Sequence, residues 1–344
     1  MGAPPRCARR HLREKPIDIA LFGAGRIGTI HAGNLARQPG ARLRYVVDPN
    51  QEAARSLAAR HGAEVGSASR VFDDAAVRAV LICSSTDTHA ELIVAAAKAG
   101  KAIFCEKPVD LAIGRARQCA DAVRAAGVTC MIGFQRRYDP TFAALKARLS
   151  AGEIGTPEML VVTSRDPGPP PLPYIRSSGG IFKDMLIHDF DIFRWILADE
   201  AESVHASASC LIDPAIAEAG DVDSTAVTIR TRGGRLCQIN TSRRAAYGYD
   251  QRFEVLGSRG MLQAGNHAPT EVVASTAEAV SRDVPERFFL ERYRAAYANE
   301  IAHFFRVLAG EETLSTTVDD GLRALELAET ATTSWRERRI VSID

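Results

Sequence analysis

The sequence predicts an α/β protein in which an N-terminal doubly wound parallel sheet is followed by a C-terminal α+β domain built on a largely antiparallel open sheet. In the first part of the chain, short apolar runs alternate with helical stretches, which is the rhythm of βαβ units. After about Gln135 the texture changes to Pro and Gly clusters and β-branched runs, which are typical of antiparallel strands. A chain of 344 residues also suits two domains better than one.

The elements of the first part follow from its apolar runs and its helical periodicity. The expected strands are Ile17–Phe22, Leu43–Val47, Ala79–Cys83, Ala102–Phe104 and Val128–Ile132. The expected helices are Arg26–Arg37, Gln51–Arg60, Ala90–Ala99 and Gly114–Ala126. Gly100 and Gly127 stand where the end of a helix favours glycine. Crossovers of this length favour right-handed βαβ units and therefore a parallel sheet.

The elements of the second part are fewer and less regular. We expect a helix over Lys183–Leu197, and a hairpin whose strands Ala226–Arg230 and Leu236–Asn240 are joined through Gly233–Gly234. Two helices, Phe289–Leu308 and Val318–Arg336, close the chain. The sequence thus divides into a basic tail (1–16), a first domain (17–134) and a second domain (135–344) whose last helix packs back on the first.

Composition narrows the class of partner. Forty-three basic and 42 acidic residues leave a formal charge of +1, so no net field attracts nucleic acid or a membrane surface, and a small-molecule partner is favoured. The seven cysteines are dispersed without a CxxC pair, which argues against a disulfide framework and a zinc site, and we expect reduced thiols in a cytoplasmic protein. No apolar run approaches the ~20 residues of a membrane span.

A glycine-rich turn follows the first expected strand. Ile17–Phe22 runs into Gly-Ala-Gly-Arg-Ile-Gly, which opens a helix, and this strand–loop–helix context makes the GxGxxG pattern informative. Gly23 permits the tight turn, Gly25 leaves room for a pyrophosphate, and Gly28 lets helix and strand approach closely. The amides at the helix start then face the phosphates. The candidate cofactor contacts of this loop are Gly23, Gly25, Arg26, Ile27 and Gly28.

Asp48 is the residue that we expect to distinguish NAD from NADP. It lies 20 residues after Gly28, at the end of the second expected strand, where a carboxylate can accept hydrogen bonds from the adenosine ribose. The same carboxylate repels a 2′-phosphate, and Pro49 and Asn50 supply no cation, so NAD is preferred over NADP. The alternative is an aspartate that caps the next helix.

Further candidate contacts lie at the carboxyl ends of later strands. Ser84, Ser85 and Thr86 follow the strand that ends at Cys83, where dinucleotides pass, and His89 lies just beyond them. The alternative for this segment is a polar loop that caps the helix beginning near Thr88.

Glu106 and Lys107 also emerge at this edge, beside the expected nicotinamide, and Pro108 disfavours helical geometry at Lys107. Asp184 and His188 are spaced i, i+4 on one expected helix, so both side chains share a face. Alcohol oxidation needs a base for the hydroxyl proton and positive charge beside the developing alkoxide, and Lys107, Asp184 and His188 supply that set.

The i, i+4 spacing of Asp184 and His188 does not by itself establish a function. A helix N-terminal acid one turn before a buried histidine would show the same pattern without a function. Asp189 and Asp191 also invite a metal site, but their side chains point in different directions around a helix and no second ligand cluster is evident, so we expect no metal. If His188 is the base, it must be neutral, which predicts an alkaline rate optimum.

Five motifs carry a resemblance that spacing cannot establish: GAGRIG (23–28), FCEKP (104–108), GFQRRYDP (133–140), SGGIFKDMLIHDFD (178–191) and YGYDQRFEVLGSRG (247–260). From about Ile17 onward the chain resembles the glucose–fructose oxidoreductase and inositol dehydrogenase (Gfo/Idh/MocA) family, and the last three motifs are most similar to inositol 2-dehydrogenases. The resemblance implies a Rossmann domain over 17–134 that binds NAD, and a C-terminal domain for substrate binding and assembly, often into tetramers.

The resemblance also implies site roles. His188 would be the general base, Asp184 would orient it, and Lys107 would hydrogen-bond the reacting hydroxyl. Arg136, Asp166 and Tyr249 would bind the other hydroxyls of a polyol ring, and Glu106 would help to position the nicotinamide. Arg136 and Asp166 could instead be surface charges, Tyr249 a packed strand residue and Glu106 a loop acid.

The implied reaction is the NAD-dependent oxidation of myo-inositol to 2-keto-myo-inositol (scyllo-inosose). The alternatives are another inositol isomer or a sugar on the same scaffold, because fold alone does not choose a substrate. A non-catalytic NAD-binding regulator is a further alternative, which the presence of Lys107, Asp184 and His188 disfavours.

Overall fold

The computed structural model describes residues 16–343, so all of the predicted basic tail except Pro16 lies outside the described residues. The first sheet has the strand order β3-β2-β1-β4-β5-β6 with every neighbouring pair parallel. Its strands are β1 (Ile17–Phe22), β2 (Ala41–Val47), β3 (Glu64–Val65), β4 (Val77–Ile82), β5 (Ala102–Glu106) and β6 (Cys130–Gly133). This order is that of the Rossmann fold, so the predicted doubly wound parallel sheet is confirmed.

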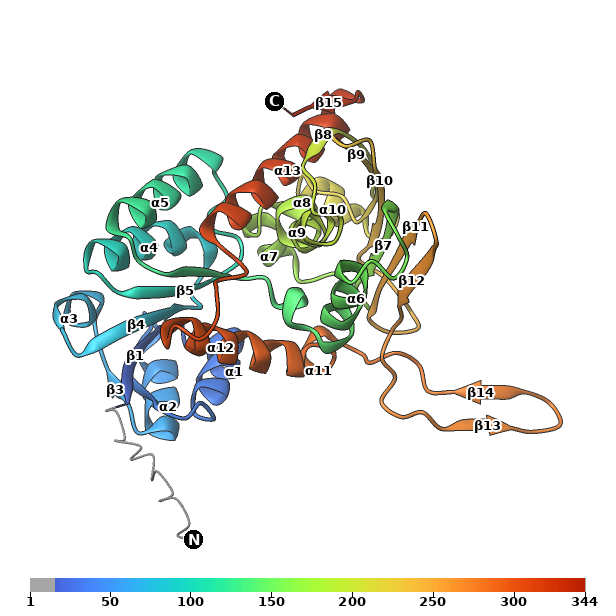
Figure 1. The fold of residues 1–344 in the computed structure, drawn as a ribbon. Coiled ribbons are helices and arrows are strands. Elements are labelled where there is room, and N and C mark those ends of the chain that lie inside the picture. Colours follow the sequence, from blue (N-terminus) through green and yellow to red (C-terminus); the bar gives the residue numbers. More distant parts are fainter. Residues whose placement is uncertain (1–15, 344) are drawn as a thin grey trace, which may run out of the picture.

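Helices cover both faces of this sheet (Figure 1). They are α1 (Arg26–Leu35), α2 (Gln51–His61), α3 (Ala68–Asp73), α4 (His89–Lys98) and α5 (Ile113–Ala126). Successive residues of β1 point to opposite faces of the sheet. Ile19 and Leu21 pack with α1 and α2, whereas Ala20 and Phe22 pack with α3, α4 and α5. Gly100 and Gly127 have positive φ and end their helices as predicted.

The second sheet has the order β12-β11-β7-β10-β9-β8-β15. Its strands are β7 (Pro157–Arg165), β8 (Ala201–Ser209), β9 (Ser224–Thr231), β10 (Leu236–Ser242), β11 (Asp250–Gly257), β12 (Gly260–Ala264) and β15 (Val341–Ser342). Only β7 and β10 pair in parallel, so the predicted largely antiparallel sheet and its β9–β10 hairpin are confirmed. Buried and exposed residues alternate along β9 and β10, because helices cover one face alone.

The helices of the second part lie between and around the two sheets (Figure 1). They are α6 (Pro140–Ser150), α7 (Leu172–Ser177), α8 (Gly180–Asp184), α9 (Leu186–Leu197), α10 (Pro214–Glu218), α11 (Phe289–Arg292), α12 (Arg294–Leu308) and α13 (Val318–Glu337), with a 3₁₀ turn at Gln135–Tyr138. Ile301 and Phe304 of α12 join the core on the α1 face of the first sheet, and α13 contacts both α5 and β8. A separate hairpin, β13 (Val273–Ser275) and β14 (Val280–Arg282), projects as an arm.

Two predicted helices are each broken in the structure. The helix expected over Lys183–Leu197 is divided at Met185 into α8 and α9, and the helix expected over Phe289–Leu308 is divided at Tyr293 into α11 and α12. No proline or glycine marks either break, so periodicity could not reveal them. Because α8 ends at Asp184 and α9 begins at Leu186, Asp184 and His188 do not share one helix.

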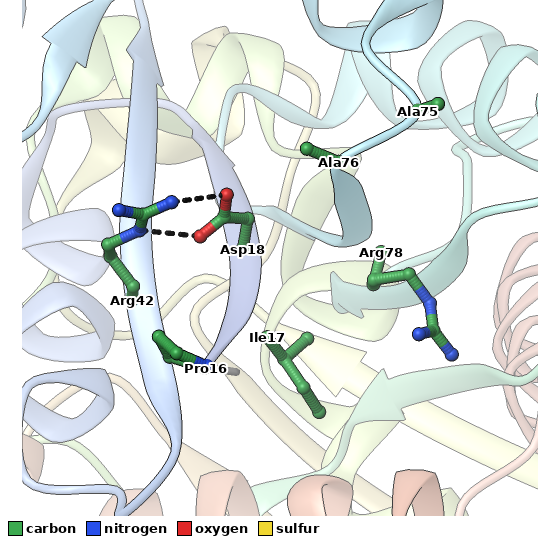
Figure 2. A pocket seen from close by; sticks show the side chains of 7 residues that line it. All are labelled: Pro16, Ile17, Asp18, Arg42, Ala75, Ala76 and Arg78. Atoms are coloured by element: carbon green, nitrogen blue, oxygen red, sulfur yellow. Dashed lines mark hydrogen bonds and ion pairs between the residues drawn. The ribbon is translucent and has the colours of Figure 1, made fainter. Parts of the chain in front are cut away.

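The carboxyl edge of the first sheet faces the second part of the chain. At the opposite, amino edge, the starts of β1, β2 and β4 line a shallow pocket, where Arg42 pairs with Asp18 (Figure 2). The polar motifs lie at the carboxyl edge, where folds of this kind bind their ligands. Among residues 16–343, no helix is long and apolar enough to cross a membrane.

Candidate active site

The glycine loop is shaped for a close backbone approach. Gly23 has a φ of +96°, and a Cβ on it would lie 2.5 Å from the carbonyl oxygen of Cys83. A Cβ on Gly28 would lie 1.9 Å from the carbonyl oxygen of Gly23, so helix and strand touch here as predicted. Gly25, the residue before α1, has nothing within 4 Å of its Cβ position and provides no side-chain cap. Open space and uncapped helix amides fit a pyrophosphate.

Asp48 holds this loop from the end of β2. Its Oδ2 accepts a hydrogen bond from the Ala24 amide at 2.7 Å, and its Oδ1 accepts one from the Asn50 amide at 2.7 Å. The cap of α2 is Asn50, whose side chain accepts from the amides of Glu52 and Ala53. The helix-capping alternative for Asp48 is therefore wrong, and its carboxylate lies beside the glycine loop.

The predicted polar segment after β4 forms a short 3₁₀ turn at this edge. Ser84 Oγ and Thr88 Oγ1 are 2.6 Å apart, and Ser85 and Thr86 lie at the start of the turn. Thr88 stands at the start of α4 but makes no side-chain capping hydrogen bond, so the segment is a polar turn without the capping bond of the alternative.

His89 is buried behind this turn. Its Nδ1 lies 2.7 Å from the carbonyl oxygen of Pro108 and its Nε2 lies 3.1 Å from that of Ser84. Burial lowers its pKa. The ring therefore connects the loop after β4 to the loop that follows Lys107, and it supports both loops from the interior of the domain.

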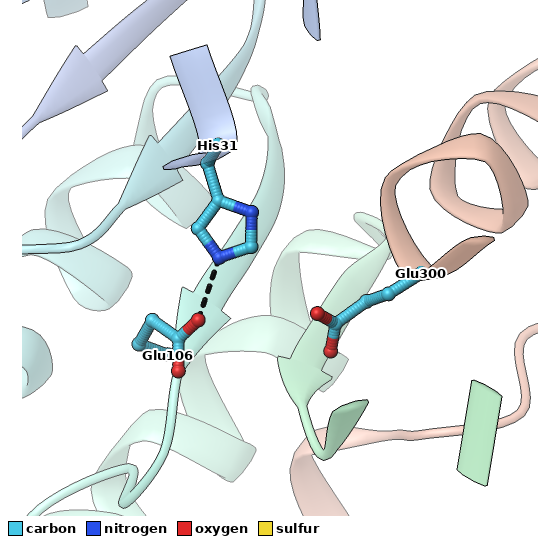
Figure 3. A group of neighbouring side chains, drawn as sticks. All are labelled: His31, Glu106 and Glu300. Carbon is cyan, nitrogen blue, oxygen red and sulfur yellow. Dashed lines mark hydrogen bonds and ion pairs between the residues drawn. The ribbon is translucent and has the colours of Figure 1, made fainter. Parts of the chain in front are cut away.

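Glu106 is the last residue of β5, and its carboxylate is paired with a histidine. Its Oε1 lies 2.6 Å from Nε2 of His31, a buried residue of α1 (Figure 3). A Cβ on Gly133 of β6 would lie 3.2 Å from its carboxyl group, so this carboxyl group is enclosed by its neighbours. The loop-acid alternative for Glu106 is wrong, and sequence reasoning missed His31.

Lys107 connects the first sheet to α8. Its Nζ donates to the main-chain carbonyl oxygen of Asp184 at 2.9 Å and lies 3.5 Å from Asp184 Oδ1. Two residues that sequence reasoning missed complete the shell of this carboxylate: Tyr174 donates to Oδ1 at 2.8 Å, and Arg243 Nη1 lies 3.5 Å from Oδ2. Arg243 is 1% exposed, yet its Nε and Nη2 have no hydrogen-bond partner. Its place in the segment before Tyr249 was the available signal.

His188 lies in the first turn of α9 and is buried. Its ring meets Phe134 edge-on, with centroids 6.2 Å apart, and its Nδ1 has no hydrogen-bond partner. Burial lowers its pKa well below the usual 6.5, and the positive charges of Lys107 and Arg136 lower it further. Among the described residues no hydrogen bond joins Asp184 to His188, since the helix is broken between them.

Arg136 and Asp166 lie among the same groups. Arg136 is 2% exposed and forms an ion pair with the buried Asp189, and its Nη2 donates to Ser164 Oγ at 3.3 Å. The surface-charge alternative for Arg136 is wrong. Asp166 is partly buried, and burial raises its pKa to about 7, with the negative charge of Asp184 adding to the rise.

Tyr249 is buried near both of these groups. Burial raises its pKa well above the usual value, while the positive charge of Arg136 opposes the rise. Its ring stands edge-on to that of Tyr293, with centroids 5.9 Å apart. Arg136, Asp166 and Tyr249 thus lie close enough to perturb one another's ionisation.

The two aspartates that suggested a metal site are bound by guanidinium groups. Asp189 pairs with Arg136, and Asp191 accepts hydrogen bonds from Arg137, whose Nε lies 2.8 Å from Oδ2. Asp191 lies 1% exposed, so this pair is a buried structural contact. These carboxylates are used for charge pairing within the fold.

A dinucleotide-type glycine loop and a lysine, an aspartate and a histidine at one sheet edge define a two-domain nicotinamide-dependent oxidoreductase. Residues 17–134 match the oxidoreductase family with an NAD-binding Rossmann fold, and residues 142–263 match the GFO/IDH/MocA C-terminal domain. The chain belongs to this GFO/IDH/MocA family, and it is an NAD-binding oxidoreductase. The resemblance inferred from its motifs is confirmed.

Individual relatives are similar over nearly the whole chain. The inositol 2-dehydrogenase of Rhizobium meliloti (strain 1021) is 46% identical over 95% of this chain and 99% of that enzyme. The crystal structure of a myo-inositol dehydrogenase from Corynebacterium glutamicum has a TM-score of 0.92 and 43% identity, over 96% of this chain and 99% of the other. A scyllo-inositol dehydrogenase from Lactobacillus casei, with bound NAD(H) and scyllo-inositol, has a TM-score of 0.87 and 26% identity over 95% and 99%.

Proposed function

We propose that the protein oxidises a secondary alcohol of a cyclic polyol to a ketone with NAD, and that its substrate is myo-inositol, giving 2-keto-myo-inositol (scyllo-inosose). The observation that carries this proposal is the cluster of Lys107, Asp184 and His188 beside the buried Arg136 and the partly buried Asp166. The inositol dehydrogenases among the relatives support the substrate class.

The glycine loop has room for the pyrophosphate of NAD. Gly25 leaves open space before the uncapped start of α1, and Asp48 lies where it can meet a ribose. We assign cofactor contacts to Gly23, Gly25, Arg26, Ile27, Gly28, Asp48, Ser84, Ser85, Thr86, Glu106 and Lys107, and to His89 the support of the turn after β4 from behind instead of the predicted direct contact. When bound, the nicotinamide of NAD supplies the acceptor for the hydride of the carbinol carbon.

The side chains supply proton transfer and charge. His188 is neutral because its pKa is depressed, so it can accept the proton of the reacting hydroxyl, a contribution of about 10²–10⁴-fold. Lys107 places its ammonium beside the oxygen that becomes negative, and Asp184 holds that ammonium through its carbonyl oxygen. We therefore assign Asp184 to positioning Lys107 rather than to a direct bond with His188.

A polyol ring has further hydroxyls, and we assign their binding to Arg136, Asp166 and Tyr249. Each is buried or partly buried at the same edge, where a desolvated polar group favours a hydroxyl partner. Arg136 Nε has no hydrogen-bond partner in the part of the chain that the structure describes, so it can donate to a substrate hydroxyl.

The remaining proposals concern organisation. We assign residues 17–134 to NAD binding and residues 135–344 to substrate binding and assembly, with the last helix packed back on the first domain. The open face of the second sheet suits assembly into a tetramer. The six described cysteines form no disulfide, which supports a cytoplasmic location.

The test is NADH formation by purified protein with NAD or NADP and myo-, scyllo- and chiro-inositol or glucose. The proposal expects the highest kcat/KM for myo-inositol with NAD. The similarity to the L. casei scyllo-inositol dehydrogenase makes scyllo-inositol the second candidate substrate. A higher kcat/KM for scyllo-inositol than for myo-inositol would make it the assigned substrate. Turnover that survives both His188→Ala and Lys107→Met would refute the assigned chemistry, and no turnover with NAD bound would favour a regulator.

A further inference from the structure

Glu300 of α12 directs its carboxyl group toward the pair formed by His31 and Glu106 (Figure 3). One ligand atom from each of the three residues lies within 4.8 Å of the others. The side chain of Glu300 is fully buried, and neither of its carboxyl oxygens has a hydrogen-bond partner within residues 16–343. A buried, unpaired carboxylate is costly, and a second carboxylate nearby raises that cost. Either a proton or a cation must offset it.

The geometry favours the proton. His31 Nε2 and Glu106 Oε1 are 2.6 Å apart, which is a hydrogen-bond distance, whereas two ligands of a tetrahedral metal at ~2.0 Å would lie about 3.3 Å apart. The other ring nitrogen of His31 has no partner, although a metal-bound histidine ordinarily donates its second N–H.

The charges around Glu300 agree with this. Besides His31 and Glu106, the titratable groups that face it are Tyr297, Tyr138 and Cys83, none of which carries positive charge. Among the described residues, no lysine or arginine forms an ion pair with Glu300. Burial, together with the charge of Glu106, raises the pKa of Glu300 well above its usual range.

We propose that Glu300 is a positioning residue for the oxidation: it is held as a neutral carboxylic acid, so that it packs beside Glu106 without charge repulsion and leaves the His31–Glu106 pair, and with it the end of β5 that presents Lys107, in place. Glu106 is the last residue of β5 and directly precedes Lys107. Glu300 comes from α12, so the C-terminal part of the chain packs against the end of the strand that precedes the catalytic lysine. The kinetic test rests on the proposed function, whereas the spectroscopic test does not.

The spectroscopic test is the infrared carbonyl stretch of a protonated carboxylic acid in the full-length protein at neutral pH. A band that is present in the wild type, lost in Glu300→Gln and retained in Glu311→Gln, a control at an exposed glutamate, is expected. Identical spectra of the wild type and Glu300→Gln would overturn the proposal. So would a stoichiometric divalent metal in the purified wild type that Glu300→Gln lacks.

The kinetic test compares pH profiles. When Glu300 ionises at alkaline pH, its charge repels Glu106 and displaces the end of β5, so kcat of the wild type is expected to decline there. Glu300→Gln cannot ionise and is expected to retain kcat at alkaline pH, whereas Glu311→Gln, the exposed control, is expected to follow the wild-type profile. An alkaline decline of kcat in Glu300→Gln equal to that of the wild type would overturn the proposal.

Discussion

Lys107 donates from Nζ to the main-chain carbonyl oxygen of Asp184 at 2.9 Å, and the same ammonium lies 3.5 Å from the Oδ1 of that residue. Lys107 follows a strand of the first sheet, whereas Asp184 ends a helix of the second part. The contact therefore closes the site across two regions that are distant in sequence. It also places a partly buried positive charge at a defined point near His188.

The first prediction concerns this charge. Lys107→Met should lower kcat for polyol oxidation by about 10²–10³-fold, because the developing alkoxide loses its stabilising donor. Lys98→Met, at an exposed position on α4, is the matched control and should retain wild-type kcat. Steady-state NADH formation measures both. A Lys107→Met enzyme with wild-type kcat would contradict the assigned role.

The second prediction concerns pH. The sequence led us to expect an alkaline optimum, but burial keeps the pKa of His188 well below 6.5, so the imidazole is already neutral at neutral pH. We expect kcat for oxidation to stay level as the pH falls from 8 to about 6.5 and to decline only under more acid conditions, where His188 gains a proton. His205→Gln, at an exposed histidine, should leave this profile unchanged. A kcat that drops with an inflection near the usual histidine pKa would count against a buried base.

The third prediction concerns Asp166. Its pKa of about 7 means that it loses its proton as the pH rises through neutrality, and an ionised Asp166 accepts hydrogen bonds from substrate hydroxyls more strongly. KM for the polyol should therefore fall as the pH rises through about 7. The inflection should vanish in Asp166→Asn. If it persists there, another group is responsible for it.

The fourth prediction concerns Arg243, whose positive charge opposes the raised pKa of Asp166. Arg243→Met should move the inflection in KM above pH 7, and the lost contact with Asp184 should lower kcat/KM by about 10–100-fold. Arg244→Met, at the exposed neighbouring position, serves as the control and should match the wild type. If the pH inflection in KM stays at about pH 7 in Arg243→Met, Arg243 does not influence the ionisation of Asp166.

The fifth prediction concerns cofactor choice. Asp48→Ser should lower the ratio of kcat/KM for NAD to that for NADP by about tenfold or more, because the carboxylate that repels the 2′-phosphate is removed. Asp73→Ser, at an exposed position at the end of α3, is the control. Adding Asn50→Arg should improve NADP use further but cost about 1 kcal/mol of stability, because Asn50 caps α2. An unchanged ratio would argue against the ribose contact.

Much of the fold was accessible from sequence because its signals are local. The glycine loop follows β1 directly, and apolar runs with intervening helices specify the parallel sheet. The breaks at Met185 and Tyr293 were not accessible, because no proline or glycine marks them.

The candidate site was predicted in part for the same reason. The predicted residues Lys107, Asp184 and His188 lie at one sheet edge, but the i, i+4 rule suggested a contact between the last two that the broken helix does not make. Tyr174 and Arg243 approach Asp184 from segments without a chemical motif, so only tertiary structure reveals them.

The most direct test of the central claim uses myo-inositol that carries deuterium on C2. The account predicts that the NADH formed contains the deuterium, that the rate of oxidation is lower than with unlabelled substrate, and that His188→Ala lowers this rate by about 10²–10⁴-fold. NADH without deuterium, formed at the same rate, would show that the hydride comes from another carbon or another substrate and would contradict the proposed reaction.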